Sequence, residues 1–247
     1  MKIVMMSDLH GYLPKPETVP ECDVVGLCGD IVPLDYQNDD VKSIAWFCLE
    51  FVPWTDKLRC KKVLFIAGNH DFFLEHLMYG PVNEDGVKKV RSAGEVLRKL
   101  LPGDNKGRHK IVYLRDSSFE FEGKRFYGTP WISGLPGWAF NVPEIILESD
   151  KFDKIPNKLD VLMTHIPPNL CNMGTVLQHN YHYGCEWGSD ALRKVLVAKN
   201  VKYTFCGHVH TGEHTMQEYK EGCNVVNVSI KDEDYVVRIR DFIVYDI

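Results

Sequence analysis

Residues 203–210 read Tyr203-Thr204-Phe205-Cys206-Gly207-His208-Val209-His210, so that a short apolar run ends in a glycine and two closely spaced histidines. Four other apolar runs also lead into polar groups, and they are Ile3–Met6, Val24–Cys28, Val63–Ala67 and Val161–Thr164. Their length and β-branched content are typical of buried strands. Because loops that follow the carboxyl ends of such strands converge at one edge of a sheet, the five runs predict a common site.

The polar groups behind these strands are carboxylates, imidazoles and one amide. They are Asp8, His10, Asp30, Asn69, His165, His208 and His210. Each fragment alone is common in turns, but five fragments in order after five strands favour a metal site. Oxygen and nitrogen donors favour manganese, which we expect first, with iron, zinc, nickel or cobalt as alternatives. Seven ligands exceed the needs of one ion with an open position, so two divalent ions sharing a carboxylate are expected.

The remaining chain predicts helices around a mixed sheet system. Helical periodicity covers Asp40–Phe51, Val87–Leu101 and Ser189–Asn200, the last with Ser189 as a plausible N-cap. Phe119–Tyr127 is typical of a hairpin, and the tail Val225–Ile247 is interpreted as a second hairpin. Strand–helix alternation followed by strand-rich segments indicates an α/β protein. Because no Pro/Gly/Ser-rich linker divides the sequence, residues 1–247 are expected to form a single domain.

Composition narrows the classes of partner. Acidic residues outnumber basic ones, 34 to 29, for a net charge of -5, so a long nucleic acid is not the expected partner. The chain opens with a short apolar stretch that predicts neither a signal peptide nor a membrane span. The 8 cysteines contain no CxxC pair, which favours a reduced, cytoplasmic setting. A disulfide framework is the alternative.

In chain order, the blocks are Asp8-x-His10, Gly29-Asp30, Gly68-Asn69-His70-Asp71, His165 and Gly207-His208-x-His210. This order resembles the calcineurin-like metallophosphoesterase superfamily. The resemblance implies two facing mixed β-sheets flanked by helices, a four-layer α/β/β/α sandwich. It also implies two ligand sets that share Asp30 as the bridge. One set is Asp8, His10, Asp30 and His210, and the other is Asp30, Asn69, His165 and His208.

Two further segments, Tyr127–Trp131 and Gly137–Asn141, resemble a subgroup of small metallophosphoesterase-domain proteins first described from brain. That resemblance implies a phosphodiesterase of a small nucleotide-type substrate, cyclic nucleotides included, acting through a hydroxide that bridges the metals. Ile31-Val32-Pro33 follows Asp30, where protein phosphatases carry an Asp-Arg pair, which counts against that branch. A nuclease, a phosphomonoesterase and a non-catalytic scaffold remain alternatives, and the oligomeric state stays open.

The resemblance implies that His70 is the general acid that protonates the leaving group, and Asp71 or a nearby carboxylate is expected to keep it charged. A further metal ligand or a loop cap is the alternative role for His70. Two aromatic segments, Trp131–Asn141 and Asn169–Trp187, are candidate walls for the binding site of a small phosphoester. Aromatic rings next to a phosphate site can stack a base. Their candidate contacts are Trp131, Trp138, Asn141, Asn172 and His182. Packing of the loops and the core is the alternative role for these residues.

Overall fold

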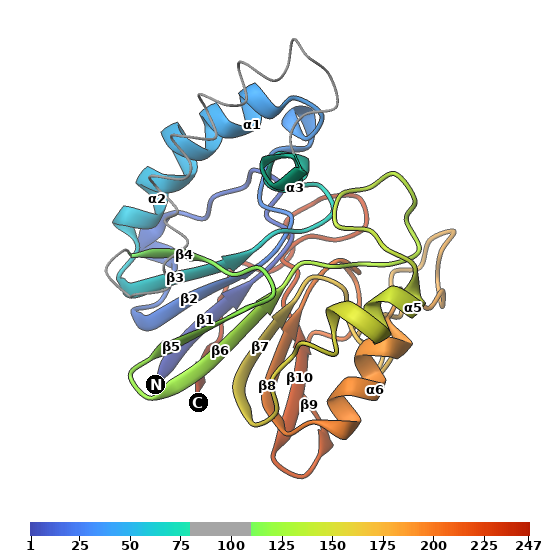
Figure 1. Ribbon diagram of the computed structural model, residues 1–247. Coiled ribbons are helices and arrows are strands. Elements are labelled where there is room, and N and C mark those ends of the chain that lie inside the picture. Colours follow the sequence, from blue (N-terminus) through green and yellow to red (C-terminus); the bar gives the residue numbers. More distant parts are fainter. Residues whose placement is uncertain (80–109) are drawn as a thin grey trace.

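The computed structural model describes residues 1–79 and 110–247 (Figure 1). Two mixed β-sheets lie face to face, and helices cover the outer face of each, so the predicted fold class is confirmed. The helix predicted over Val87–Leu101 lies outside the described residues.

The first sheet has the strand order β11-β1-β2-β3-β4. Its strands are β1 (Lys2–Met6), β2 (Cys22–Cys28), β3 (Cys60–Ile66), β4 (Ile111–Tyr113) and β11 (Val244–Asp246). The strands from β1 to β4 run parallel, and β11 is antiparallel to β1. Consequently the carboxyl ends of β1, β2 and β3 lie at one edge of this sheet.

The second sheet has the order β5-β6-β7-β8-β10-β9. Its strands are β5 (Ser117–Phe121), β6 (Lys124–Thr129), β7 (Leu159–Thr164), β8 (Val201–Cys206), β9 (Gln217–Lys220) and β10 (Cys223–Asn227). The four central strands are parallel, and β5 and β9 are antiparallel edge strands.

The hairpin predicted over Phe119–Tyr127 is confirmed as β5–β6, which turns at Gly123. The second predicted hairpin, over Val225–Ile247, is wrong. β10 pairs with β8 and β9 in the second sheet, whereas β11 pairs with β1 in the first. Both tail segments form strands, but each finds its partner elsewhere in the chain.

Helices on the first sheet are α1 (Asp40–Trp46), a π-helical turn (Phe47–Phe51), α2 (Val52–Lys57) and α3 (Phe72–Tyr79). Asp39 caps α1, because its side chain accepts a hydrogen bond from the Lys42 amide at 3.1 Å. The helix predicted over Asp40–Phe51 is therefore confirmed, and it continues to Lys57.

On the second sheet lie α5 (Glu144–Ile146), which runs into a π-helical turn (Leu147–Lys151), and α6 (Asp190–Ala198). Ser189 caps α6, since its hydroxyl accepts a hydrogen bond from the Leu192 amide at 3.0 Å. The predicted N-cap is thus confirmed.

Successive residues of a strand point to opposite faces of its sheet and so belong to two different apolar layers. In β1, Ile3 and Met5 pack between the sheets, whereas Val4 and Met6 join the core beneath the helices. The Ser7 amide donates to the Val228 carbonyl at 2.8 Å, which ties the two sheets together where β1 ends. Because one inter-sheet layer draws on both halves of the chain, we propose that residues 1–247 form one domain.

In the described ranges, helices are too short or too polar to cross a membrane.

Candidate metal centre

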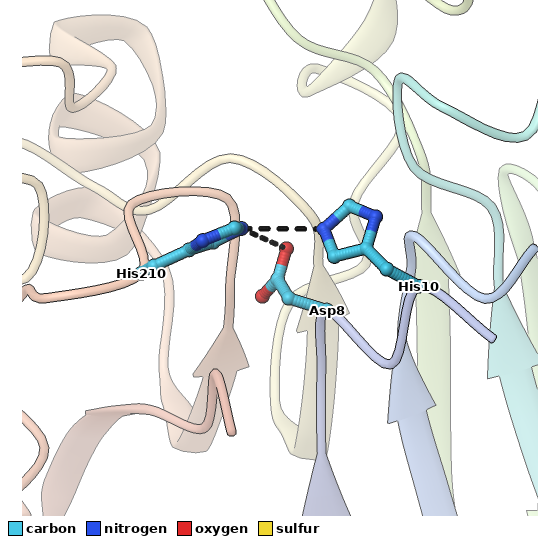
Figure 2. A group of neighbouring side chains, drawn as sticks. All are labelled: Asp8, His10 and His210. Carbon is cyan, nitrogen blue, oxygen red and sulfur yellow. Dashed lines mark hydrogen bonds and ion pairs between the residues drawn. The ribbon is translucent and has the colours of Figure 1, made fainter. Parts of the chain in front are cut away.

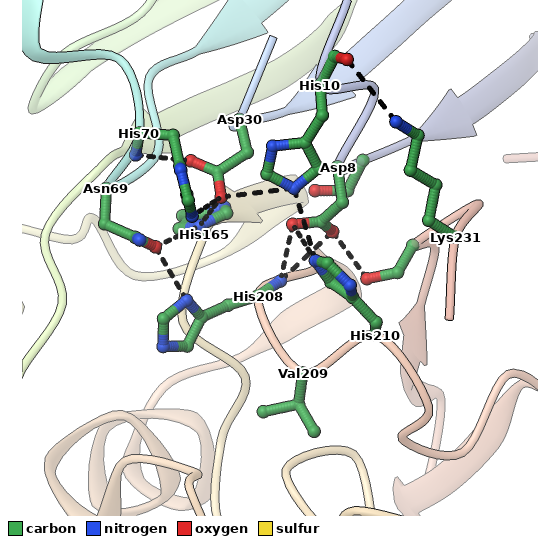
Figure 3. Close-up of polar contacts among 12 residues, drawn as sticks. Asp8, His10, Asp30, Asn69, His70, His165, His208, Val209, His210 and Lys231 are labelled. Carbon is green, nitrogen blue, oxygen red and sulfur yellow. Dashed lines mark hydrogen bonds and ion pairs between the residues drawn. The ribbon is translucent and has the colours of Figure 1, made fainter. Parts of the chain in front are cut away.

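Seven side chains with metal-ligating groups gather where parallel strands of both sheets end (Figure 3). They follow β1, β2 and β3 of the first sheet and β7 and β8 of the second. They are Asp8, His10, Asp30, Asn69, His165, His208 and His210. All are buried except His208, which is half-buried. The structure therefore brings together every side chain that the sequence analysis selected as a ligand.

Unusual backbone conformations aim several of these side chains into the site. The φ angles are 58° at Asp8, 41° at His10, 53° at Asp30 and 69° at His208. Left-handed φ values at residues other than glycine cost on the order of 1–3 kcal/mol and cluster at functional sites. Four such angles among seven converging residues indicate that the chain sustains backbone strain to position these groups.

A glycine is required next to the second ligand group. A Cβ atom placed on Gly68 would lie 2.5 Å from the Asp30 amide nitrogen and 2.7 Å from Cε1 of His165. Carbon atoms do not approach that closely, so any larger residue here must displace both neighbours. Gly68 therefore lets the loop after β3 approach Asp30 and His165 at van der Waals distance.

Asp8, His10 and His210 form the first ligand group (Figure 2). The Nε2 atoms of His10 and His210 are 3.3 Å apart, and His210 Nε2 is 3.5 Å from Asp8 Oδ1. Asp8 is itself held in place, because its Oδ2 accepts a hydrogen bond from the Ser229 hydroxyl at 2.5 Å. Two imidazole nitrogens and one fixed carboxylate oxygen thus face a common point.

Asn69, His165 and His208 form the second group. Asn69 Oδ1 lies 2.9 Å from His165 Nε2 and 2.8 Å from His208 Nδ1. Ligands that share one ion are expected to place their donor atoms at such distances from one another.

Asp30 lies between the two groups. Its Oδ2 is 3.7 Å from His10 Nε2 and 3.3 Å from His165 Nε2, one imidazole from each group. Its Oδ1 accepts a hydrogen bond from the His70 amide at 2.8 Å, which fixes the orientation of the carboxylate. One carboxylate is therefore in reach of both ligand groups, as a bridging ligand must be.

The hydrogen bonds made by the Nδ1 atoms of two imidazoles are consistent with metal binding through Nε2. His165 Nδ1 donates to the Cys28 carbonyl at 2.8 Å, and His210 Nδ1 donates to the Asp232 carbonyl at 2.8 Å. A proton on Nδ1 leaves the Nε2 lone pair directed into the site, which is the usual arrangement of a metal-ligating histidine. Three nitrogen and oxygen donors on either side of Asp30, with Asp30 as the shared fourth, fit two divalent transition metal ions.

The buried carboxylates and imidazoles of the site shift one another's pKa values. Burial alone would lower the pKa of His165, but Asp30 and Asp8 outweigh it and raise this pKa to about 9. For His210 the opposing effect of burial is likewise overcome by Asp8, which raises the pKa to about 9. Burial lowers the pKa of His208 to about 3. Two imidazolium protons thus balance two buried carboxylates, and divalent cations would take their place on binding.

His70 lies beside the ligands, and its Nε2 is 3.8 Å from Asp30 Oδ2. Asp30 is thus the carboxylate next to the His70 ring, whereas Asp71, the first residue expected to hold the ring charged, has other partners. The Asp71 carboxylate instead accepts hydrogen bonds from the backbone amides of Gly68, Ile31 and Val32, at 2.8, 3.0 and 3.1 Å. Asp71 therefore ties the loop after β3 to the loop after β2. Burial, followed by repulsion from Asp30, raises the pKa of Asp71 to about 7.

The residue that contacts the His70 ring is Gln37, whose Oε1 accepts a hydrogen bond from Nδ1. Gln37 follows a short 3-10 turn, Leu34–Tyr36, and lies 33 positions before His70. Gln37 could not be predicted from the sequence, because a glutamine after a turn carries no local signal of its partner.

A cavity of about 620 Å³ opens over the two ligand groups. Among the predicted substrate contacts, Trp138 and His182 line it, and the Trp138 ring centroid is 4.6 Å from that of His70. Trp187 and Tyr235 also line it, and neither was among the predicted contacts.

The other predicted substrate contacts have structural roles. Trp131 is buried and its Nε1 donates to Asp116 at 2.7 Å, while Asn141 Oδ1 accepts a hydrogen bond from the Leu135 amide at 3.0 Å. Asn172 has a φ of 58° in the turn where its Oδ1 accepts from the Thr175 hydroxyl at 3.5 Å. Trp131, Asn141 and Asn172 are not among the described residues that line this cavity, and packing and turn formation account for them. Their role in substrate binding stays a prediction.

Comparison with known proteins gives a consistent result. Residues 1–212 match the calcineurin-like phosphoesterase family. A UPF0046 protein of Caenorhabditis elegans is 26% identical over 219 residues, covering 86% of this chain and 52% of its own length. Human metallophosphoesterase domain-containing protein 1 is 28% identical over 224 residues, covering 88% of this chain and 63% of its own.

The chain thus spans between about half and two thirds of the length of these relatives. A solved structure, the phosphopantetheinyl hydrolase PptH of Mycobacterium tuberculosis, superposes with a TM-score of 0.51 at 15% identity. It covers 95% of this chain and 90% of its own, and the likeness is one of fold.

Proposed function

The chain belongs to the calcineurin-like phosphoesterase family, and from this premise we propose that it is a phosphodiesterase that uses two divalent metal ions. The proposed substrate is a small nucleotide-type phosphoester, cyclic nucleotides included. The observation that supports this most is the convergence of six buried or half-buried ligand residues around Asp30.

In this proposal Asp8, His10 and His210 hold one ion, and Asn69, His165 and His208 hold the other, with Asp30 shared between them. Manganese is the ion proposed first, and iron, zinc, nickel and cobalt suit the same donors. When bound, such a pair lowers the pKa of water and withdraws charge from the phosphoryl oxygens.

His70 is the proposed general acid. Its ring lines the cavity, and its Nδ1 hydrogen bond to Gln37 leaves Nε2 as the atom that transfers a proton. Protonation of the leaving oxygen matters most for alkoxides, because a poor leaving group departs slowly as an anion. Gln37 orients the ring so that Nε2 faces the reacting phosphoester.

The dimensions and walls of the cavity support a small substrate. A volume of about 620 Å³ falls in the range of small-molecule sites, which is roughly 300–1,000 Å³. Trp138 and Trp187 offer aromatic surface on which a base can stack. The net charge of -5 supports the proposal that a long nucleic acid is not the substrate.

The cysteines bear on where the protein acts. All 8 fall within the described residues and are unpaired, which supports a reducing compartment such as the cytoplasm.

A substrate panel tests the proposal. The chain is loaded in turn with manganese, nickel, cobalt and zinc, and assayed on 2′,3′- and 3′,5′-cyclic nucleotides, single-stranded DNA, p-nitrophenyl phosphate and bis(p-nitrophenyl) phosphate. We expect turnover of the diesters and at least one cyclic nucleotide, with little on DNA. Stoichiometric metal without turnover of any ester contradicts the proposal and favours a binding protein on the same fold.

A further inference from the structure

The aromatic ring of Tyr235 lies over the imidazoles of the site. Its centroid is 4.9 Å from that of His10, 5.2 Å from that of His210 and 6.3 Å from that of His70, each in an edge-on arrangement. Tyr235 as a whole is 39% exposed and lines the cavity, while its ring contacts the imidazoles of the site. It is therefore a surface that an incoming substrate meets.

The backbone holds this ring in place. Tyr235 has a φ of 61°, a conformation that bulky residues rarely adopt and that is found where a site over-determines it. The Asp232 carbonyl accepts hydrogen bonds from both the Tyr235 amide, at 2.9 Å, and His210 Nδ1, at 2.8 Å. One carbonyl thus fixes the ring and a metal-ligating imidazole relative to each other.

The Asp232 side chain stiffens the same turn. Its Oδ1 accepts hydrogen bonds from the amides of Asp234 and Val236, at 3.0 and 2.9 Å. Its Oδ2 forms an ion pair with Arg238 at 2.5 Å. A turn with this many internal bonds does not yield easily to a bulky ligand.

The Tyr235 ring contacts His10 and also lines the cavity. Among the described residues that line the cavity, His208, His210 and Tyr235 are present, whereas His10 is not. The approach to the site is thus open on the His208 side and covered by Tyr235 on the His10 side. A phosphoester bound over both ligand groups must place one of its substituents against this fixed ring.

We propose that Tyr235 is a specificity-determining residue, which limits the size of the ester group that can lie over the His10–His210 side of the site. Among diesters with the same leaving group, the one whose second substituent is smaller should be hydrolysed faster. This inference rests on the proposed function, because it concerns the same site.

The test compares two diesters with the same leaving group, methyl p-nitrophenyl phosphate and phenyl p-nitrophenyl phosphate. The Tyr235→Ala variant should raise the phenyl-to-methyl ratio of kcat/KM by about tenfold or more, since steric fit of groups this size changes rates by one to two orders of magnitude. Tyr235→Phe retains the ring and should keep the wild-type ratio. Tyr183→Ala, which removes another exposed tyrosine that does not contact the ligand imidazoles, should keep it too.

A binding measurement supplies a second readout that does not require turnover. Calorimetric affinities of methylphosphonate and phenylphosphonate for the metal-loaded chain should show the same shift toward the phenyl compound in Tyr235→Ala. An unchanged ratio in both measurements overturns the proposal, and a fall in the phenyl preference shows that the ring stacks on substrates instead.

The two proposals fail in different ways. A chain that binds the phosphonates with the predicted preference but hydrolyses no ester contradicts the proposed function and leaves the role of Tyr235 standing. A chain that hydrolyses both diesters but keeps the wild-type phenyl-to-methyl ratio in Tyr235→Ala overturns the role of Tyr235 and leaves the proposed function standing.

Discussion

Replacing Gly68 with alanine should weaken metal binding without substituting a ligand residue. The added Cβ would lie 2.5 Å from the Asp30 amide nitrogen and 2.7 Å from His165 Cε1, and a tolerable contact begins near 3.0 Å. The loops must therefore separate by at least about 0.5 Å, whereas metal–ligand distances are held to within about 0.2 Å. Because Asp30 and His165 move together, we expect metal affinity to fall by about 10–100-fold or more, as for changes behind a ligand.

The assay is a calorimetric titration of metal-stripped protein with Mn²⁺, with thermal unfolding measured on the same sample. Gly123→Ala is the matched control. Gly123 has a φ of 76° in the β5–β6 turn and has open space around its Cβ position, so this variant should lose stability but keep its metal affinity. A folded Gly68→Ala protein that binds Mn²⁺ within about twofold of wild type would refute the reasoning.

Three further changes separate the roles of neighbouring residues. Asp30→Asn should lose metal and turnover together, because the bridging carboxylate carries charge to both ions; full metal content by mass spectrometry would speak against a bridge. His70→Ala should keep both metals and lose about 10²–10⁴-fold in kcat, most on alkyl esters, and an equal loss on p-nitrophenyl esters argues against a proton donor. The hydrogen bond to Asp40 raises the pKa of His76, so this contact stabilises the fold fully below a pH of about 6.5 and progressively less as pH rises through the folded-state pKa. In urea unfolding, the deficit of His76→Gln should therefore shrink from about pH 6 to about pH 8.5, and a deficit that grows with pH contradicts the sign.

The convergence of the ligand residues could be predicted because each depends on local pattern. An apolar run predicts a strand, and a polar residue just after it lies at the carboxyl end of that strand, as Asp30 follows β2 and His165 follows β7. Once the strands are parallel, their ends meet. The hairpin at Gly123 and the cap at Ser189 were predictable for the same reason, since each involves residues close in sequence.

The predictions that differ from the structure concern contacts between segments distant in sequence. Val244–Asp246 was predicted to pair within a hairpin of the tail. It pairs instead with β1, where Val4 lies opposite Val244. Asp71 reads as a partner for its neighbour His70, yet its oxygens accept three backbone amides, and Gln37 takes its place. Tyr235 lies in a polar turn without a motif, and only tertiary structure places it over His10.

The central claim is that one carboxylate joins two ions, and electron paramagnetic resonance of the Mn²⁺-loaded chain tests it most directly. Metal analysis of the same sample gives the stoichiometry. We predict two ions per chain and an exchange-coupled spectrum in wild type, with the coupling lost in Asp30→Asn. One ion per chain, or two ions with uncoupled spectra, would contradict a metal centre bridged by Asp30.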